Sequence, residues 1–212
     1  MTPEEFRAAG YEVIDLIVDY LEGVGERPVA PDVSPGDVRA MLPERPPAEP
    51  EPWSDVRADI DRVVLPTITH WQHPNWYAYF PANTTYSSIL GELLAAGLGV
   101  QGMSWVTSPA CTEIETLMLD WMLELLDLPD RFHSTSERGG GVIQGSASEA
   151  VLVAILAARW RATAGAVNEL GDTSRLTAYM TSQAHSSVEK GLRIAGIGAE
   201  RIRIVDHDAT FA

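Results

Sequence analysis

The feature that most constrains the fold of this chain is a change of rhythm at Gly139. From there on, short apolar segments of strand character alternate with segments of helical period, namely 141–144, 147–163, 176–182, 185–196 and 201–206. Strands alternating with helices indicate α/β units around a mainly parallel sheet. Only about three strands fit here, whereas a typical sheet has five or six. We therefore expect an α/β sheet that is incomplete within the 212 residues.

The part before Gly139 is mainly helical. Apolar side chains recur every three or four residues over 3–22, which predicts an amphipathic helix that starts at Thr2 and Pro3. Residues 23–52 are rich in proline and predict an extended connector. Further helices are expected at 53–65, 88–98 and 109–130. The last carries an apolar stripe that we assign to the core: Ile114, Leu117, Met118, Trp121, Met122 and Leu125.

Composition excludes several classes of function. The chain has 30 acidic and 15 basic residues and a net charge of −15, which disfavours nucleic acid as a partner. No apolar run reaches the roughly 20 residues that span a bilayer, and the first residues lack the pattern of a signal peptide. We therefore expect a cytoplasmic protein with no membrane partner. The one cysteine, Cys111, allows no internal disulfide and is expected to be a small buried residue.

The stretch "GGGVIQGSASEA" at 139–150 has the character of a phosphate-binding turn. Gly140 and Gly145 match the glycine spacing of a P-loop, but Ser146 and Ala147 stand where that motif needs lysine and serine or threonine. Nucleoside triphosphates are therefore disfavoured. What remains is a single phosphate held by backbone N–H groups and a hydroxyl of Ser146 or Ser148 at a helix start. A helix cap without a ligand explains the same residues equally well.

Histidines provide the other candidate sites. His185 lies between a predicted strand and helix, at the sheet edge where open α/β folds bind ligands, and next to the junction at Ser146. Its ring could stack on a flat ligand or move a proton, or it could simply cap the helix. His70 and His73 are spaced like a metal pair, but no cysteine or helical period supports one, so we expect no metal. His207 is assigned to a surface turn.

Five stretches together closely resemble the pyridoxal-phosphate-dependent aromatic-L-amino-acid decarboxylases, the group II decarboxylases. They are "EFRAAGYEVIDLIVDYLEG", "HWQHPNWYAYFPAN", "GMSWVTSPACTEIE", "GGGVIQGSASEA" and "SQAHSSVEKG", and the similarity runs from residue 4 to 212. The resemblance implies an α/β, type I pyridoxal-phosphate (aspartate aminotransferase-like) fold. It implies a helical N-terminal dimerisation segment at 1–85, with its linker at 23–52. It also implies that 86–212 is the first, incomplete part of the cofactor-binding large domain.

The resemblance also implies a cofactor and a site. Pyridoxal 5'-phosphate would place its phosphate on Ala147 and Ser148, and the catalytic His185 would stack on the pyridine ring. An aromatic pocket suits an aromatic amino-acid substrate. In the expected homodimer, residues 101–103 reach the partner's active site. The implied substrate-pocket residues are Trp71, Tyr79, Phe80, Pro81, Ala82, Gln101 and Met103.

Three positions depart from the family pattern. Relatives that act on hydroxylated substrates often have threonine where Ala82 stands, and Gln101 and Met103 replace larger apolar residues. Tryptophan, phenylalanine, tyrosine and dihydroxyphenylalanine therefore all stay open as substrates.

The family's lysine that holds the cofactor covalently would lie beyond residue 212, as would the acid that pairs with the pyridine nitrogen. The single lysine, Lys190, stands roughly 140° around the helix from His185 and is expected to be solvated. We therefore expect the N-terminal half of a decarboxylase, inactive alone and dependent on the missing C-terminal half. The alternatives are a truncated, non-catalytic paralogue that only dimerises and a decarboxylase for another amino acid.

Overall fold

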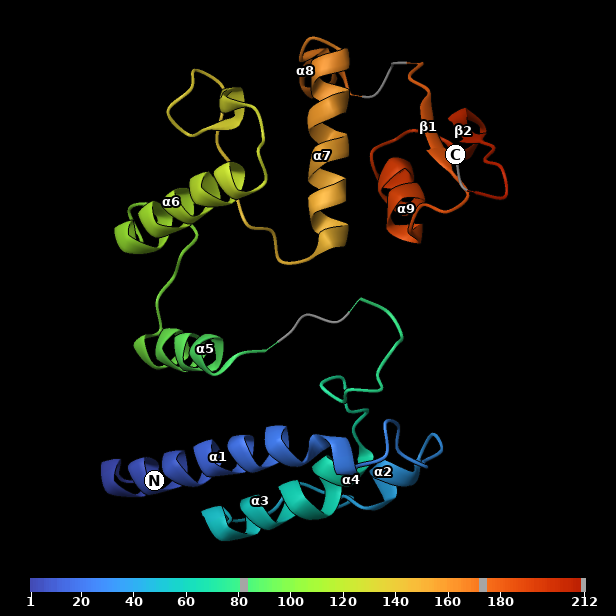
Figure 1. Cartoon of the computed structure of the whole chain (residues 1–212). Coiled ribbons are helices and arrows are strands. Elements are labelled where there is room, and N and C mark those ends of the chain that lie inside the picture. Colours follow the sequence, from blue (N-terminus) through green and yellow to red (C-terminus); the bar gives the residue numbers. More distant parts are fainter. Residues whose placement is uncertain (81–83, 172–174, 211–212) are drawn as a thin grey trace. The chain divides into compact units, whose positions relative to one another are not determined.

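The computed structural model describes residues 1–80, 84–171 and 175–210 (Figure 1). The chain divides into two compact units, Met1–Gly99 and Val100–Ala212. The expected domain boundary at residue 85 stays a prediction.

The first unit is helical. Its first helix begins with a capping box, in which the Thr2 hydroxyl accepts from the amide of Glu5 and the Glu5 carboxylate accepts from the amide of Thr2. This confirms the helix predicted for 3–22. The elements are α1 (Pro3–Gly23), η1 (Val24–Glu26), α2 (Asp37–Ala40), α3 (Trp53–Asp59), η2 (Ile60–Val64), α4 (Leu65–Thr67) and α5 (Tyr86–Leu98).

Two details of this unit differ from the prediction. The connector at 23–52 contains two short helical turns, η1 and α2. The helix that starts at Trp53 does not end before Pro66 but runs to Thr67 through the π-helical turn η2. A proline ring inside a helix crowds the carbonyl of the residue four positions earlier. For Pro66 that residue is Arg62, which lies in the wider π-helical turn η2.

The second unit contains the α/β part. Its strands β1 and β2 are parallel, with Ala178 opposite Ile202 and Thr181 opposite Val205, and α9 lies between them in the sequence. The predicted parallel α/β arrangement is therefore confirmed. The elements are α6 (Pro109–Leu125), η3 (Asp130–Phe132), α7 (Ala147–Ala162), α8 (Ala166–Leu170), β1 (Ala178–Thr181), α9 (Ser186–Ile194), η4 (Ala199–Arg201) and β2 (Ile202–Val205).

The strand predicted at 141–144 is wrong for this structure. These residues form neither helix nor strand, and Val142 and Ile143 are 60% and 66% exposed. The amide of Ile143 donates to a carboxylate oxygen of Glu115 at 2.7 Å. A strand needs a neighbour to complete its hydrogen bonds, and no strand of the described residues pairs with this segment.

The assignment of the α6 stripe to the core is also wrong here. Its exposure ranges from 48% at Leu117 and Met118 to 81% at Leu125, and the buried residue of this helix is Leu123. The helix ends at Leu125, five residues before the predicted end. Cys111 is half-buried. The described part of the chain has no helix long and apolar enough to cross a membrane.

Candidate functional site

The start of α7 is a capped helix terminus. Ser146 is its N-cap, and the Ser146 hydroxyl accepts from the amide of Glu149 at 3.2 Å. The amide of Gly145 donates to the Glu149 carboxylate at 3.1 Å. We call residues 145–149 the phosphate turn. These two bonds satisfy the amides of Gly145 and Glu149 and fix the backbone of the turn.

The capping leaves two amides of the phosphate turn available. The N–H groups of Ala147 and Ser148 find no acceptor among the described residues. The first amides of a helix have no partner inside the helix, and its dipole makes this end positive. Two adjacent N–H groups beside the Ser148 hydroxyl fit a phosphate monoester. The residues present therefore fit the phosphate of pyridoxal phosphate.

His185 is the N-cap of α9. Its Nδ1 accepts from the amide of Ser187 at 3.2 Å and lies 2.9 Å from the Ser187 hydroxyl. Because the amide donates to Nδ1, the neutral ring carries its hydrogen on Nε2. The side chain is exposed. The cap therefore orients an accessible imidazole ring at the carboxyl end of β1.

The packing of α7 against α9 brings these two helix starts to the same level. A Cβ on Gly191 would lie 3.0 Å from Ile155 Cδ1, and farther along both helices the Arg159 guanidinium donates to the carbonyl of Ala195. The two helices therefore run in the same direction. The same Cβ would lie 3.7 Å from Leu152 Cα, and Gly191 and Leu152 each stand five residues after the first residue of their helix. The helix α9 lies beside α7 (Figure 1). This register supports the expected adjacency of Ser148 and His185, which stays a prediction.

His207, which the sequence assigned to a surface turn, lies at the same edge and contacts the turn that carries His185. Its Nε2 is 3.1 Å from the Ser182 hydroxyl and 3.2 Å from Gln183 Nε2, while its Nδ1 lies 3.1 Å from the carbonyl of Asp208. The carbonyl can only accept, so Nδ1 donates and Nε2 accepts. His207 thus joins the end of β2 to the turn that carries His185. Open α/β sheets bind ligands at the carboxyl ends of their strands, and the position of His207 just after β2 could have indicated that it lies there.

Two acidic residues of α6 hold the segment that leads into the phosphate turn. Glu115 accepts from Ile143, as described above, and Asp120 accepts from the amide and hydroxyl of Ser134 at 2.9 and 2.6 Å. The hydroxyl and then the amide of Ser134 lower the pKa of Asp120, and His133 adds to the effect. No sequence motif pointed to these contacts, because each joins residues far apart in the chain.

The aromatic residues at 71–80 form a cluster in the first unit. The rings of Trp71 and Tyr79 stack 5.6 Å apart at 7°, and Trp76 lies 5.2 Å from Trp71 and 6.1 Å from Tyr79. Tyr79 has a φ of 58°, in the left-handed region that a tyrosine rarely adopts. Trp71 is 46% exposed and Phe80 is fully exposed. Pro81 and Ala82 lie outside the described residues.

The other expected pocket residues belong to the second unit. Gln101 and Met103 are exposed in the segment before α6. Their expected contact with a partner's site stays a prediction, as do the roles of the aromatic residues. Lys190 is exposed on α9, as expected of a solvated residue. No three His, Cys, Asp or Glu side chains among residues 1–80, 84–171 and 175–210 could hold a metal ion.

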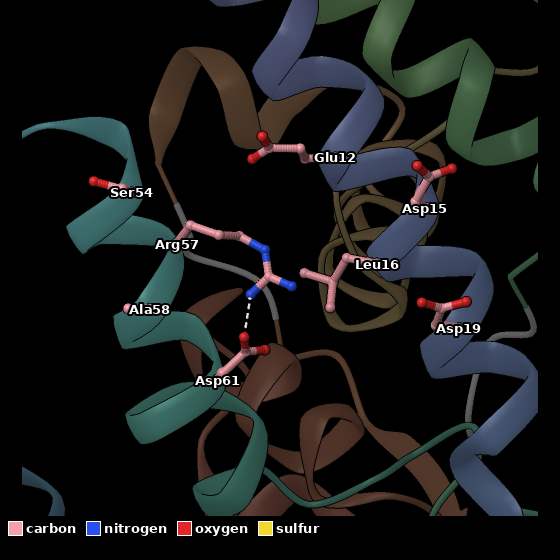
Figure 2. A pocket seen from close by; sticks show the side chains of 8 residues that line it. All are labelled: Glu12, Asp15, Leu16, Asp19, Ser54, Arg57, Ala58 and Asp61. Carbon is pink, nitrogen blue, oxygen red and sulfur yellow. Dashed lines mark ion pairs between the residues drawn. The ribbon is translucent and has the colours of Figure 1, made fainter.

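A pocket in the first unit is lined by none of these residues. Figure 2 shows Arg57 between α1 and α3, with its guanidinium 2.6 Å from a carboxylate oxygen of Asp61. The lining is mostly acidic and contains no expected cofactor contact; it consists of Glu12, Asp15, Leu16, Asp19, Ser54, Arg57, Ala58 and Asp61. We therefore do not assign the cofactor site to this pocket.

Solved structures define the class of fold. The chain resembles the tryptophan decarboxylase of Catharanthus roseus, solved in complex with L-tryptophan, with a TM-score of 0.90 and 38% identity. The match covers 99% of this chain and 44% of that one. The fold is that of the type I pyridoxal-phosphate enzymes, with the helical N-terminal segment that the sequence predicted.

A family model described as the pyridoxal-dependent decarboxylase conserved domain matches residues 35–212. The chain belongs to this family. The expected cofactor, pyridoxal 5'-phosphate, is thereby confirmed at the level of the family.

Curated relatives carry several names. Aromatic-L-amino-acid decarboxylase of Rattus norvegicus is 43% identical over all of this chain and 45% of its own length. Two proteins of Drosophila melanogaster, 3,4-dihydroxyphenylacetaldehyde synthase and histidine decarboxylase, are 50% and 46% identical over 90% and 99% of this chain. These matches cover 39% and 25% of the two relatives. The chain thus spans less than half the length of these relatives.

Proposed function

We propose that this chain supplies the phosphate-binding and ring-stacking part of an enzyme that decarboxylates aromatic L-amino acids to amines and CO₂. The observation that carries the proposal is the pair of available amides on Ala147 and Ser148, at the start of a helix that packs against the helix capped by His185. A phosphate anchor beside a flat imidazole ring suits a cofactor that has one phosphate and one aromatic ring.

Each part of the site has a distinct task. The bound cofactor takes up the electron pair left when the bond between Cα and the carboxylate breaks. Ala147 and Ser148 hold the phosphate through their amides, and the Ser148 hydroxyl adds a third donor. His185, fixed through Nδ1, keeps the cofactor ring flat. The aromatic segment 71–80 is assigned to the pocket for the flat side chain of the substrate.

The proposal extends to the substrate, the partner and the compartment. An aromatic substrate is supported by the rat relative's name and by the aromatic residues at 71–80. We assign Gln101 and Met103 to the active site of a partner subunit in a homodimer, and we place the enzyme in the cytoplasm. The choice among tryptophan, phenylalanine, tyrosine and dihydroxyphenylalanine is left to experiment.

We further propose that the 212 residues alone do not catalyse the reaction. Lys190, the single lysine, is exposed on α9, and we assign it no covalent role. After incubation with pyridoxal phosphate and borohydride reduction, mass spectrometry should find no specific adduct on Lys190. The chain should also release no CO₂ from L-tryptophan. An adduct on Lys190 together with CO₂ release that Lys190→Ala abolishes would contradict this assignment.

A chimaera tests the decarboxylase proposal itself. Residues 1–212 are joined to the part of the rat relative that follows its matched segment. The chimaera should release CO₂ from at least one of the four aromatic amino acids, and His185→Ala should lower that activity by at least about a hundredfold. A folded, cofactor-bound chimaera that is inactive on all four would contradict the proposal.

Histidine decarboxylation is the second candidate function. It is favoured by the 46% identity to the Drosophila melanogaster histidine decarboxylase. The same chimaera should therefore be assayed with L-histidine at equal concentration. A chimaera that prefers histidine would mean that histidine, and not an aromatic amino acid, is the substrate.

The remaining alternative is a non-catalytic chain. If the chain dimerises but shows no phosphate-dependent cofactor binding, it acts in dimerisation alone.

A further inference from the structure

A hydrogen-bonded pair of side chains, Tyr20 and His70, joins the first helix to the segment before the aromatic cluster. The hydroxyl of Tyr20 on α1 lies 3.0 Å from Nδ1 of His70, and the two rings are 5.6 Å apart and tilted by 39°. His70 is only 2% exposed. Fifty positions in the sequence separate the two residues, so the contact closes a long loop.

A series of backbone bonds continues from His70 towards the aromatic cluster. The amide of His70 donates to the carbonyl of Val29 at 3.0 Å. The amide of His73 donates to the carbonyl of His70 at 3.0 Å, and that of Trp76 to the carbonyl of His73 at 2.9 Å. His73 is buried as well, and its Nδ1 accepts from the amide of Asn75 at 2.9 Å. Displacing His70 would therefore disturb the whole run up to Trp76.

The direction of the bond between Tyr20 and His70 depends on protonation. Burial raises the pKa of Tyr20, although Arg27 opposes this, so the phenol stays protonated and can donate. Burial lowers the pKa of His70, and the positive charge of Arg27 and the neighbouring His73 lower it further. The neutral imidazole therefore accepts at Nδ1.

The groups that face His70 come from three places in the first unit. Tyr20 belongs to α1, and Arg27 follows η1 and lies 5.8 Å from the centre of the Tyr20 ring. His73 belongs to the same segment as His70. None of the three is a carboxylate that could stabilise an imidazolium. A proton on Nδ1 would remove the acceptor for Tyr20 and leave a buried cation beside Arg27.

We propose that Tyr20 and His70 are positioning residues that hold the aromatic segment 71–80 against the first helix, and that protonation of His70 releases it. The proposal rests on the proposed function only in assigning that segment to the substrate pocket. The release would loosen the stack of Trp71, Trp76 and Tyr79 on acidification and make substrate binding weaker in acid.

The first test removes only the phenolic hydroxyl. Tyr20→Phe is compared with Tyr11→Phe, an exposed tyrosine of the same helix, in the 212-residue chain without cofactor. NMR titration of the histidine Cε1–H signals should find His70 titrating below its ordinary value in the parent chain. Tyr20→Phe should raise that pKa, because the neutral ring loses its donor, and Tyr11→Phe should leave it unchanged. An unchanged pKa in Tyr20→Phe would overturn the proposal.

The second test measures opening of the segment itself. Hydrogen–deuterium exchange over residues 69–77, corrected for the intrinsic rate, should rise about fivefold in Tyr20→Phe, as the loss of one hydrogen bond predicts. In the parent chain it should also rise between pH 7.5 and a pH about one unit below the His70 pKa found by NMR, because that pKa is lowered. His70→Asn keeps an acceptor that does not titrate, so its exchange should stay low at both pH values.

Exchange over α1 and α7 serves as the reference. An equal rise of exchange in these helices would mean general destabilisation. An exchange rate at 69–77 that does not change with pH in the parent chain would mean that the segment is not released. Either result overturns the proposal. Neither measurement uses the cofactor. Failure of the Tyr20–His70 proposal is therefore distinguishable from failure of the chimaera to decarboxylate.

Discussion

At the scale of single residues, the available amide of Ala147 matters more than its side chain. Ala147 is the first residue of α7, and Ser146 before it is extended, with φ −158° and ψ 160°. Proline is tolerated at the first helical position and favours an extended residue before it. The position therefore allows the removal of one N–H group from the phosphate turn while the helix is kept.

Ala147→Pro should weaken binding of pyridoxal phosphate to the 212-residue chain and to the chimaera. The expected loss of affinity is about tenfold or more, because a hydrogen bond to a charged group is removed. Helix content and the unfolding midpoint should change little. Pyridoxal without its phosphate is the matched control and should bind equally well to both forms. Equal loss for both ligands would contradict the role of the amide.

The stability of the folded chain depends on pH through Asp120. Its pKa is lowered in the folded state by the Ser134 hydroxyl and amide and by His133. The stabilisation is therefore fully present above the ordinary aspartate pKa of about 4 and is lost as pH falls through the lower folded value.

Urea unfolding between pH 7 and pH 3 should show this dependence. Asp120→Asn should be less stable than the parent at pH 7, and the difference should shrink towards pH 3. Ser134→Ala should give the same trend, whereas Ser136→Ala, whose hydroxyl donates to the carbonyl of Arg131, should not. A difference that is constant over the whole pH range would argue against Asp120 as the titrating group.

At the scale of elements, the contact between α7 and α9 aligns the two halves of the proposed cofactor site. Gly191 is buried at this contact, where an added Cβ would lie 3.0 Å from Ile155 Cδ1 and 3.7 Å from Leu152 Cα. A side chain at this position would push the helices apart and shift His185 relative to Ser148.

Gly191→Ala should destabilise the chain by about 1–3 kcal/mol, the usual cost of overpacking. It should also weaken binding of pyridoxal phosphate, because His185 shifts relative to Ser148. Adding Ile155→Val, which removes the crowded Cδ1 atom, should recover part of both losses. Denaturant unfolding and cofactor titration of the single and double variants measure this. No recovery in the double variant would contradict the contact.

At the scale of the whole molecule, the described helices leave much apolar surface uncovered. The chain of 23.1 kDa exposes 16415 Å², whereas two separate globular units of that total mass would expose about 12,000 Å². The α6 stripe belongs to this apolar surface. Such a surface favours association with another protein surface.

The 212-residue chain should therefore self-associate and bind a hydrophobic dye. Replacing Leu117 and Trp121 together by glutamine should lower both effects and keep the helix content, because both side chains are about half exposed. Glu124→Gln on the same helix is the control. Sedimentation velocity and dye fluorescence are the measurements, and no difference between the double variant and the control would contradict this account.

The local parts of the fold and site were predictable from sequence. The caps at Thr2 and Ser146 and the long helices depend on residues within a few positions of one another. The same holds for the amides of the phosphate turn. The strand at 141–144 failed because strand character is completed only by a pairing partner, and apolar side chains alone do not supply one.

Tertiary structure decided the contacts between distant residues. Gly191 against Ile155, His207 against Ser182 and Tyr20 against His70 each depend on how the chain closes loops, which no local pattern encodes. By itself, the sequence determined which groups can bind a phosphate, stack on a ring or cap a helix. The tertiary structure decided which of them share an edge, because packing of side chains sets the register between elements.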